Sequence, residues 1–335
     1  MKRKPKDKFC RDYATVSIKI DAILKSTIWG GEKIASLKGI SSTSDTIGES
    51  WEVADVKNDK STIRGGALAG RTLSQLLTTY RGDLVGQAVY ERFADKFPLL
   101  IKYIDAHDNL SIQVHPDDDT AMARHNSLGK TEMWYVVDSV PGAELIMGFE
   151  GVRTREEYLA RVADGTLDTI LHKVPVEKGD VFFIPSGTVH AIGKGIVIAE
   201  IQESSDITYR IFDYNRKDKD GRGRQLHTEL ALDVVDFKAY NLSKTPYTVN
   251  AGGVTPVVEC SYFTTSVIEM QGGELACDYT QTDSFVVYMC LEGDVAIECE
   301  GTSPVSMAKG ETVLLPAVIK EVCLKGTGRL LEVHM

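Results

Sequence analysis

The chain has 335 residues, of which 43% are hydrophobic and 26% are charged, a composition typical of folded globular proteins and not of disordered ones. Its 48 Asp and Glu residues outnumber its 38 Lys and Arg residues, and the net charge of -10 disfavours nucleic-acid binding, which requires a basic surface. The length is typical of two or three domains.

The N-terminus carries a basic stretch from Lys2 to Arg11, which we expect to be a solvated tail. No apolar segment follows it, so it does not have the pattern of a secretory signal. No apolar run in the chain reaches the roughly 18 residues that a membrane span requires. We therefore expect a cytoplasmic protein with no membrane partner.

Most of the first part of the chain has the pattern of β-strands. Short runs rich in Val, Ile, Phe and Tyr are bounded by Gly, Asp and Pro, as in a β-sandwich or barrel. The expected strands are Ser17–Ile20, Leu99–Ile104, Leu110–Val114, Trp134–Val137, Glu144–Met147, Val181–Ile184 and Ile196–Ile201.

Helices are expected in two regions of this part. Leu73, Leu76 and Leu77 recur at helical spacing, and a second helical stretch follows near Asp83–Phe93. Further on, Thr154 and Glu157 form a capping-box pattern that predicts the start of a helix. Gly165 is expected to end this helix, and residues 167–171 are expected to form a second one.

A loop rich in Pro, Gly and Asn, Ser243–Pro256, separates this part from the rest of the chain. We place the domain boundary there, with a first domain of residues 1–245 and a second of residues 246–335. Almost no helix is expected in the second domain. Its expected strands are Phe263–Met270, Phe285–Leu291, Val295–Cys299, Glu311–Leu315 and Leu330–Val333.

Six cysteines are present, and five of them follow residue 255, mostly in apolar runs. None of them forms a CxxC pair, which disfavours zinc ribbons and thioredoxin-like chemistry. We expect buried, reduced thiols.

A weak internal repeat relates the two parts. Glu132–Asp138 resembles Phe285–Leu291, and Lys178–Pro185 resembles Lys309–Pro316 more closely. After the shared Pro, the first copy continues to His190, whereas the second copy has no His there. The first copy therefore has residues for chemistry, and the second is expected to be structural.

The repeated unit resembles a cupin, a jelly-roll β-barrel with metal ligands in its interior. Gln113 and His115 are two residues apart, a spacing that directs both side chains to one face of a strand. Glu132 opens the next strand, and His190 follows the Pro185 turn. Two His, one carboxylate and one amide oxygen are suitable ligands for zinc or another divalent transition ion. Each residue alone could be an ordinary core or surface side chain, so the prediction depends on the four together.

Four segments in order make the resemblance specific. Ser111–Asp117, Gly129–Met133, Pro185–His190 and Tyr209–Arg216 resemble the type I mannose-6-phosphate isomerase family, and Trp29–Gly31 and Gly48–Glu52 are consistent with it. The length resembles that of the short bacterial members. The resemblance implies two tandem cupin domains, with a few helices packed on the first and no metal ligands in the second. It also implies interconversion of mannose 6-phosphate and fructose 6-phosphate through a cis-enediolate.

The resemblance also implies roles for individual residues. The metal ligands would be Gln113, His115, Glu132 and His190, holding one Zn²⁺ per chain, or another divalent transition metal. Arg210 and Lys130 would be catalytic, and Ser111 and Glu200 would contact the sugar phosphate. The assembly would be a monomer or a homodimer.

The residue that moves the proton is left open. Lys130 is two residues from Glu132, so both side chains are expected to face the same way, where nearby cations would lower the pKa of the lysine. Lys130 could instead bind the phosphate, and Glu200, Asp213 and His107 are alternative proton carriers. The charged segment Arg216–Arg224 lacks the terminal Glu of an EF-hand and is expected to be a solvated loop.

Two other functions remain possible from the sequence. One is a different metal-dependent cupin, such as another sugar-phosphate isomerase or an epimerase. The other is a non-catalytic protein of two cupin domains that binds a sugar.

Overall fold

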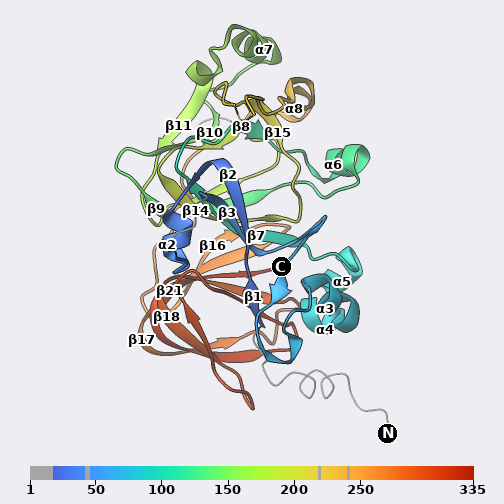
Figure 1. Cartoon of the computed structure of the whole chain (residues 1–335), viewed down its shortest axis with the longest axis vertical. Helices are drawn as coiled ribbons and strands as arrows, with labels where there is room; N and C mark the ends of the chain where they lie inside the picture. Colours follow the sequence, from blue (N-terminus) through green and yellow to red (C-terminus); the bar gives the residue numbers. More distant parts are fainter. Residues whose placement is uncertain (1–17, 42–45, 218–219, 240–241) are drawn as a thin grey trace.

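The structure is a computed structural model that describes residues 18–41, 46–217, 220–239 and 242–335. Two β-barrels lie one above the other along the long axis of the molecule (Figure 1). The mainly β architecture predicted from the sequence is confirmed. The basic stretch Lys2–Arg11, Cys10 and the start of the strand expected at Ser17–Ile20 lie outside the described residues. None of the helices in the described ranges is long and apolar enough to cross a membrane.

The first barrel consists of two antiparallel sheets that enclose an apolar core containing Trp134, Leu145 and Phe182. The six-stranded sheet has the order β12 (Val181–Ile184), β9 (Glu132–Ser139), β14 (Ile196–Glu203), β7 (Leu99–Ala106), β3 (Ile47–Val53) and β2 (Ile23–Gly31). The five-stranded sheet has the order β11 (Leu171–Pro175), β10 (Glu144–Phe149), β13 (His190–Ile192), β8 (Ile112–Val114) and β15 (Tyr209–Phe212).

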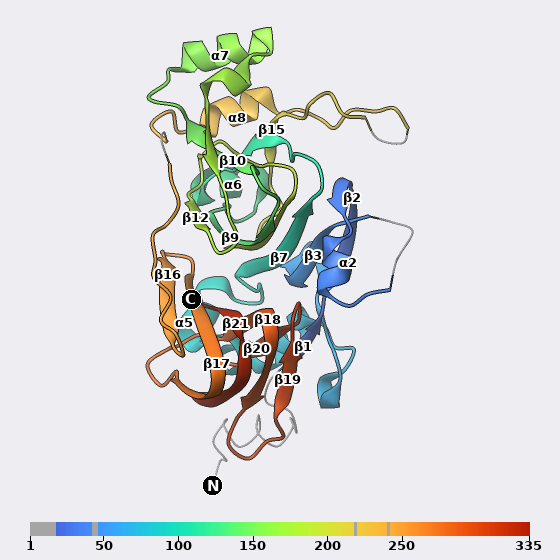
Figure 2. The same ribbon diagram turned by 90° about the vertical axis from the view of Figure 1, so that its left-hand side faces the viewer.

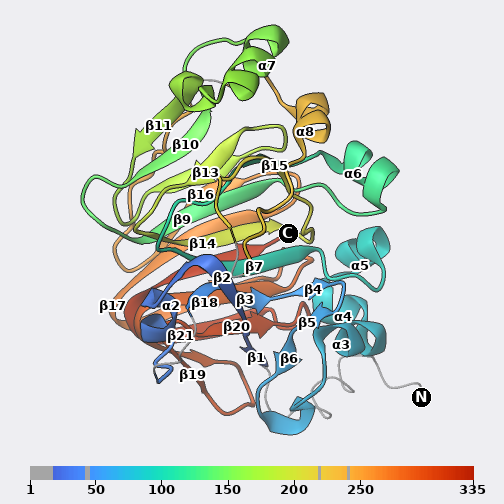
Figure 3. The same ribbon diagram turned by 45° about the horizontal axis from the view of Figure 1, so that its top comes forward.

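The second barrel is built on one eight-stranded sheet (Figure 2). Its order is β16 (Val254–Glu259), β17 (Thr264–Asp278), β21 (Glu321–His334), β18 (Val286–Glu298), β20 (Thr312–Leu315), β1 (Ile18–Asp21) and β6 (Thr62–Ile63), with β19 (Val305–Ala308) paired to β18. The strand β1, the first in the described residues, therefore pairs with β20 of the second barrel (Figure 3), and Ile18 lies opposite Leu314 in the register. The boundary between residues 245 and 246 stays a prediction about the sequence.

The remaining elements lie around the two barrels. Within the described residues all of them belong to the first part of the chain: α2 (Lys33–Leu37), β4 (Asp55–Val56), β5 (Asp59–Lys60), η1 (Gly66–Leu68), α3 (Leu73–Tyr80), α4 (Gly82–Val85), α5 (Gln87–Phe93), α6 (Asp118–His125), α7 (Arg155–Asp164), η2 (Leu167–Ile170) and α8 (Thr228–Val234). The helices α3–α5 also reach the second barrel, since the backbone N–H of Phe285 donates to the Val85 carbonyl at 3.3 Å.

The helix expected over Asp83–Phe93 is divided in two at Gly86, which has a φ of 97°. A Cβ at this position would lie 2.0 Å from the Asp283 carbonyl oxygen of the second barrel. The close approach of that loop and the positive φ therefore explain both the glycine and the break.

The prediction for the second helical region is partly wrong. The side chain of Thr154 accepts a hydrogen bond from the Glu157 N–H at 3.2 Å, and Gly165 ends α7 in the left-handed conformation, as predicted. Residues 167–171 do not form an α-helix: the first four form the 3₁₀ helix η2, and Leu171 begins β11. Spacing alone does not distinguish a buried turn followed by a strand from one short helix.

Several strands of the structure have no counterpart in the sequence prediction, and two predicted strands form one continuous strand. The strands β2 and β3 were not predicted, because polar residues interrupt their apolar positions. The runs expected at Phe285–Leu291 and Val295–Cys299 form the single strand β18, which has a register shift between Cys290 and Glu292. The five described cysteines form no disulfide, and two of them, Cys277 and Cys290, are buried.

The internal repeat is visible in the strand register. In the first barrel Ile184 pairs with Glu132, and in the second barrel Leu315 pairs with Val286. The counterpart of Glu132 is therefore the apolar Val286, one residue beyond the position in the sequence alignment. The second barrel thus has a hydrocarbon side chain where the first has a carboxylate.

Candidate metal centre and active site

Three potential metal ligands meet between the two sheets of the first barrel. His190 opens β13, Glu132 opens β9, and His115 follows the end of β8. One ligand atom of each lies within 4.8 Å of the others, and all three side chains are almost fully buried. The pairing of His190 with Gln113 in the register brings the fourth predicted ligand to the same place.

The backbone fixes the orientation of both imidazoles. His115 Nδ1 lies 2.8 Å from the Ile207 carbonyl oxygen, and His190 Nδ1 lies 2.9 Å from that of Thr188. A carbonyl only accepts hydrogen bonds, so each Nδ1 carries the proton and each Nε2 lone pair is left for a ligand. Burial and the Lys130 charge lower the pKa of His190 to about 4, and burial lowers the pKa of His115 well below its usual value. Both rings are therefore neutral near pH 7.

The donor set fits a divalent transition ion. Glu132 Oε1 is buried and has no hydrogen-bond partner among the described residues, although it lies 3.3 Å from His190 Nε2. Gln113 has its amide nitrogen 3.2 Å from His190 Nε2, and a half-turn of the amide would place its oxygen there instead. Two imidazole nitrogens, one carboxylate and one amide oxygen leave such an ion with net positive charge.

Lys130 lies at the edge of this cluster. Its Nζ is 2.7 Å from Glu132 Oε2, 3.0 Å from His115 Nε2 and 3.6 Å from Glu200 Oε1. Its side chain is only 5% exposed. The expectation that Lys130 and Glu132 face the same way is therefore met.

A second buried lysine, Lys102, belongs to the same network and was missed in the sequence. It pairs with Glu200 in the register of β7 and β14, with its Nζ 3.0 Å from Glu200 Oε1 and 3.6 Å from Glu49 Oε2. Trp134 Nε1 donates to the other Glu200 oxygen at 3.1 Å. The available signal was a single charged residue inside the apolar run Leu99–Ile104.

The two carboxylates of the network have opposite electrostatic environments. Burial and the Glu200 charge raise the pKa of Glu132 to about 7. Burial alone would also raise the pKa of Glu200, but Lys102 and Lys130 outweigh it and lower that pKa to about 2. Burial disfavours the Lys102 ammonium, yet its two glutamate partners hold its pKa above the usual value. The two lysines therefore favour the anionic form of Glu200.

Arg210 lies on β15 opposite Gln113, so it projects from the same face of the sheet. Its Nε donates to Ser111 Oγ at 3.3 Å, and its Nη1 donates to the Gln225 carbonyl at 3.0 Å. Ser111 is buried, whereas Arg210 is half-buried. The structure thus brings Ser111, Arg210 and the metal-ligand candidates to one end of the barrel interior.

The alternative proton carriers named from the sequence lie in different surroundings. Asp213 accepts hydrogen bonds from both Arg216 and Arg224, with Arg224 Nε 2.7 Å from its Oδ2. His107 follows β7 on the exposed surface. Neither belongs to the buried cluster. Two residues of the expected solvated loop Arg216–Arg224, at positions 218 and 219, lie outside the described residues.

Comparison with known proteins gives consistent matches over nearly the whole chain. Residues 17–138 match the family model of the type I phosphomannose isomerase catalytic domain, and residues 254–335 match that of the mannose-6-phosphate isomerase cupin domain. The mannose-6-phosphate isomerase of Streptococcus mutans is 37% identical over 308 residues, 92% of this chain and 94% of the relative. The mannose-6-phosphate isomerase ManA of Bacillus subtilis is 36% identical over 316 residues, 93% of this chain and 97% of the relative.

Solved structures show the same fold. The crystal structure of the mannose 6-phosphate isomerase from Bacillus subtilis superposes with a TM-score of 0.86 at 31% identity, over 96% of this chain and 100% of the other. A variant of the phosphomannose isomerase from Salmonella typhimurium, at 17% identity and a TM-score of 0.79, shares the fold over 96% of this chain and 99% of the other. The tandem cupin fold expected from the sequence is confirmed. By its sequence matches and its fold, the chain belongs to the type I phosphomannose isomerase family.

Proposed function

We propose that this chain is a metal-dependent aldose–ketose isomerase that interconverts mannose 6-phosphate and fructose 6-phosphate. The observation that supports this most is the buried cluster of His115, Glu132 and His190 beside a lysine and an arginine. The reaction moves a proton between C2 and C1, and it needs a cationic group at the developing oxyanion and a proton carrier beside the carbon. The relatives that cover most of the chain carry the name of this activity.

The proposed metal is zinc, one ion per chain, held by Gln113, His115, Glu132 and His190. A solved structure of the same fold, a mannose 6-phosphate isomerase bound with zinc and yttrium, is 17% identical to this chain. When bound, a divalent ion would polarise the sugar carbonyl. Neutral imidazoles with a fixed tautomer suit zinc and neighbouring transition metals alike, so another divalent ion is an alternative.

Lys130 is proposed to carry the proton. Its Nζ is almost fully buried against Glu132 and Glu200, whereas a phosphate ligand would be expected at a more exposed position. Glu200, held as an anion between Lys102 and Lys130, would fix the lysine and contact the sugar. Lys102 would act as a positioning residue through Glu200.

Arg210 is proposed to stabilise the enediolate, with Ser111 donating a hydrogen bond to the substrate. The guanidinium is a rigid fork of donors that stays charged, and its orientation is set by the Ser111 hydroxyl and the Gln225 carbonyl. The cytoplasmic location and the state of monomer or homodimer stay predictions from the sequence.

The test is a coupled assay with mannose 6-phosphate on the purified protein, before and after treatment with a chelator, together with elemental analysis. We expect about one divalent transition metal per chain, activity that disappears with the metal, and activity that returns when zinc is restored. His190→Ala should lose the metal while it keeps its fold by circular dichroism. Full metal retention in His190→Ala would contradict the proposed metal site, and full activity without metal would contradict the proposed metal-dependent reaction.

A further inference from the structure

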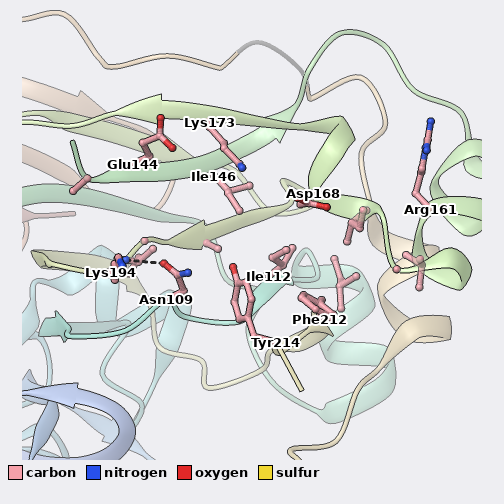
Figure 4. Close-up of a pocket in the computed structure, with 18 of the residues that line it drawn as sticks. Asn109, Ile112, Glu144, Ile146, Arg161, Asp168, Lys173, Lys194, Phe212 and Tyr214 are labelled. Carbon is pink, nitrogen blue, oxygen red and sulfur yellow. Dashed lines mark hydrogen bonds between the residues drawn. The ribbon is translucent and has the colours of Figure 1, made fainter. Parts of the chain in front are cut away.

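A cavity of about 610 Å³ lies on the outer face of the five-stranded sheet, between that sheet, η2 and the segment that follows β15 (Figure 4). Its volume is typical of small-molecule sites, which range over about 300–1,000 Å³. None of its lining residues is a metal-ligand candidate or one of the four residues proposed to contact or transform the substrate. The cavity is therefore separate from the site described above.

The register explains why one sheet carries both sites. His190 pairs with Gln113 on one side and with Met147 on the other, and these side chains face the barrel interior. Side chains alternate along a strand, so Ile112 and Ala191 face outwards, where they form the floor of the cavity. The candidate metal centre and this floor are thus opposite faces of the same strands.

The walls of the cavity are largely apolar. Phe212 pairs with Ile112 in the register, and the Tyr214 ring lies 5.1 Å from the Phe212 ring in a T-shaped arrangement. Tyr214 is 36% exposed, and Leu226, which also lines the cavity, is 47% exposed. Large apolar side chains that remain exposed around a cavity favour a ligand with an apolar or aromatic body.

Charged side chains make the β10–β11 end of the cavity positively charged. Lys173 of β11 lies opposite Ile146, Lys194 lies in the turn between β13 and β14, and Glu144 lies on β10 (Figure 4). Within the described part of the chain, none of these three side chains takes part in an ion pair, and all three are exposed. Two cations and one acid leave this end with one excess positive charge.

At the opposite end of the cavity the positive and negative charges cancel. Arg161 of α7 and Asp168 of η2 both line the cavity there, and Arg161 Nη1 donates to Thr166 Oγ1 at 3.2 Å. The charge complement of the whole cavity is therefore a single negative charge, located at the lysine end.

We propose that this cavity binds a small amphipathic monoanion, with an aromatic or aliphatic body against Ile112 and Phe212 and an acidic head group between Lys173 and Lys194. The proposal goes beyond the isomerase activity and does not depend on it. A carboxylate, a sulfonate or a phosphate diester would satisfy the two lysines, and the apolar body would cover the exposed Tyr214 and Leu226 side chains.

The experiment is a fluorescence titration of the full-length, metal-loaded protein with anilinonaphthalene sulfonate, an aromatic monoanion whose emission rises in apolar surroundings. We expect saturable binding of one probe per chain, undisturbed by saturating mannose 6-phosphate. The double variant Lys173→Ala/Lys194→Ala should weaken binding about five- to thirtyfold, because two charge contacts are removed. Lys96→Ala, at an exposed lysine remote from the cavity, should bind as the wild type does.

Two further arms separate the head group from the body. The uncharged parent compound, phenylnaphthylamine, should bind wild type and the lysine double variant equally. Leu226→Glu should abolish sulfonate binding, whereas Leu24→Glu, at a similarly exposed leucine of β2, should not. Circular dichroism identifies any variant that fails to fold, and the lysine double variant carries the test in that case. Absence of saturable binding, equal binding by the double variant and Lys96→Ala, or displacement by mannose 6-phosphate would each overturn the proposal.

Discussion

The surroundings of Arg210 favour a role in stabilising the transition state over a role in binding the substrate phosphate. Its guanidinium is half-buried and held by the Ser111 hydroxyl and the Gln225 carbonyl, so its donors point in fixed directions. A fixed donor stabilises charge that develops only in the transition state better than a mobile one does, because it requires no reorganisation during the reaction. A mobile cation would serve equally well for holding a phosphate.

Arg210→Lys keeps the charge and removes the fork. We expect kcat to fall by about 10²–10³ while KM for mannose 6-phosphate changes little, because the lost interaction is made in the transition state. Steady-state kinetics on the metal-loaded variant measure both. A rise in KM with kcat nearly intact would assign Arg210 to ground-state phosphate binding instead.

Glu203 gives the fold a pH dependence of its own. This last residue of β14 is buried and accepts a hydrogen bond from the Thr131 N–H at 2.7 Å. Burial, with the nearby Asp118 carboxylate, raises its pKa from 4.5 to about 8. The folded chain therefore binds this proton more tightly than the unfolded chain, so the associated stability is complete below the unfolded pKa and is lost as the pH rises to about 8.

Glu203→Gln should remove this dependence while keeping the shape of the side chain. We expect the free energy of unfolding of the variant, relative to that of the wild type, to rise by on the order of 3 kcal/mol as the pH increases from about 5 to about 9. Denaturant unfolding at several pH values measures the difference. Glu259→Gln, at an exposed glutamate, is the control, and a difference that does not change with pH would contradict the account.

Some single residues of the site could be predicted and others could not. Gln113, His115 and His190 were expected to lie together. The two-residue spacing directs Gln113 and His115 to one face of a strand, and His190 follows the turn at Pro185. The structure does bring the three side chains together. Lys102 was not predicted. A lone lysine in an apolar strand has the same local pattern whether it reaches solvent or a buried glutamate, and only the pairing of β7 with β14 distinguishes the two.

At the scale of elements, glycine positions show where the barrels constrain their surroundings. Gly86 and Gly39 both have a positive φ, but only at Gly86 is there no room for a side chain, because the Asp283 carbonyl approaches it. A sequence pattern predicts the helical residues on either side of Gly86. It does not predict the break, which depends on a loop nearly 200 positions further along the chain.

The two glycines form a matched pair for mutation. Gly39→Ala should cost about 1 kcal/mol of stability from backbone strain alone. Gly86→Ala should cost clearly more, about 2–4 kcal/mol, because α4 or the Asp283 loop must also move. Equilibrium denaturation gives both values. Equal losses in the two variants would show that the contact with the second barrel is unimportant.

At the scale of the whole molecule, the two barrels are joined by more than the linker. The strand β1 pairs with β20, Tyr103 donates to the Cys290 carbonyl at 3.3 Å, and the Phe97 and Phe285 rings lie 4.5 Å apart. The sequence repeat predicted two barrels. It also predicted that the second barrel lacks metal ligands at the positions that correspond to Glu132 and His190 of the first. It did not predict that β1 would pair with the second barrel, because pairing between residues so far apart leaves no local pattern.

A chain that ends at Lys244 should therefore aggregate. Removal of the second barrel leaves β1 without β20 and exposes the apolar side chains of α4 and β7 that now pack against it. Size-exclusion chromatography of the truncated protein measures the outcome. A soluble, monodisperse and fully active fragment would mean that the second barrel is dispensable.

The central claim is that a buried metal centre with Lys130 beside it moves a proton between C2 and C1 of a sugar phosphate. Proton NMR of mannose 6-phosphate in deuterated water tests this directly, because deuterium uptake at C1 of fructose 6-phosphate and formation of this ketose are followed in the same sample. With metal-loaded wild type we expect the ketose to form with deuterium at C1, and with Lys130→Met we expect neither ketose nor deuterium uptake. Ketose formation at the wild-type rate by Lys130→Met, or no ketose from the metal-loaded wild type, would contradict the account.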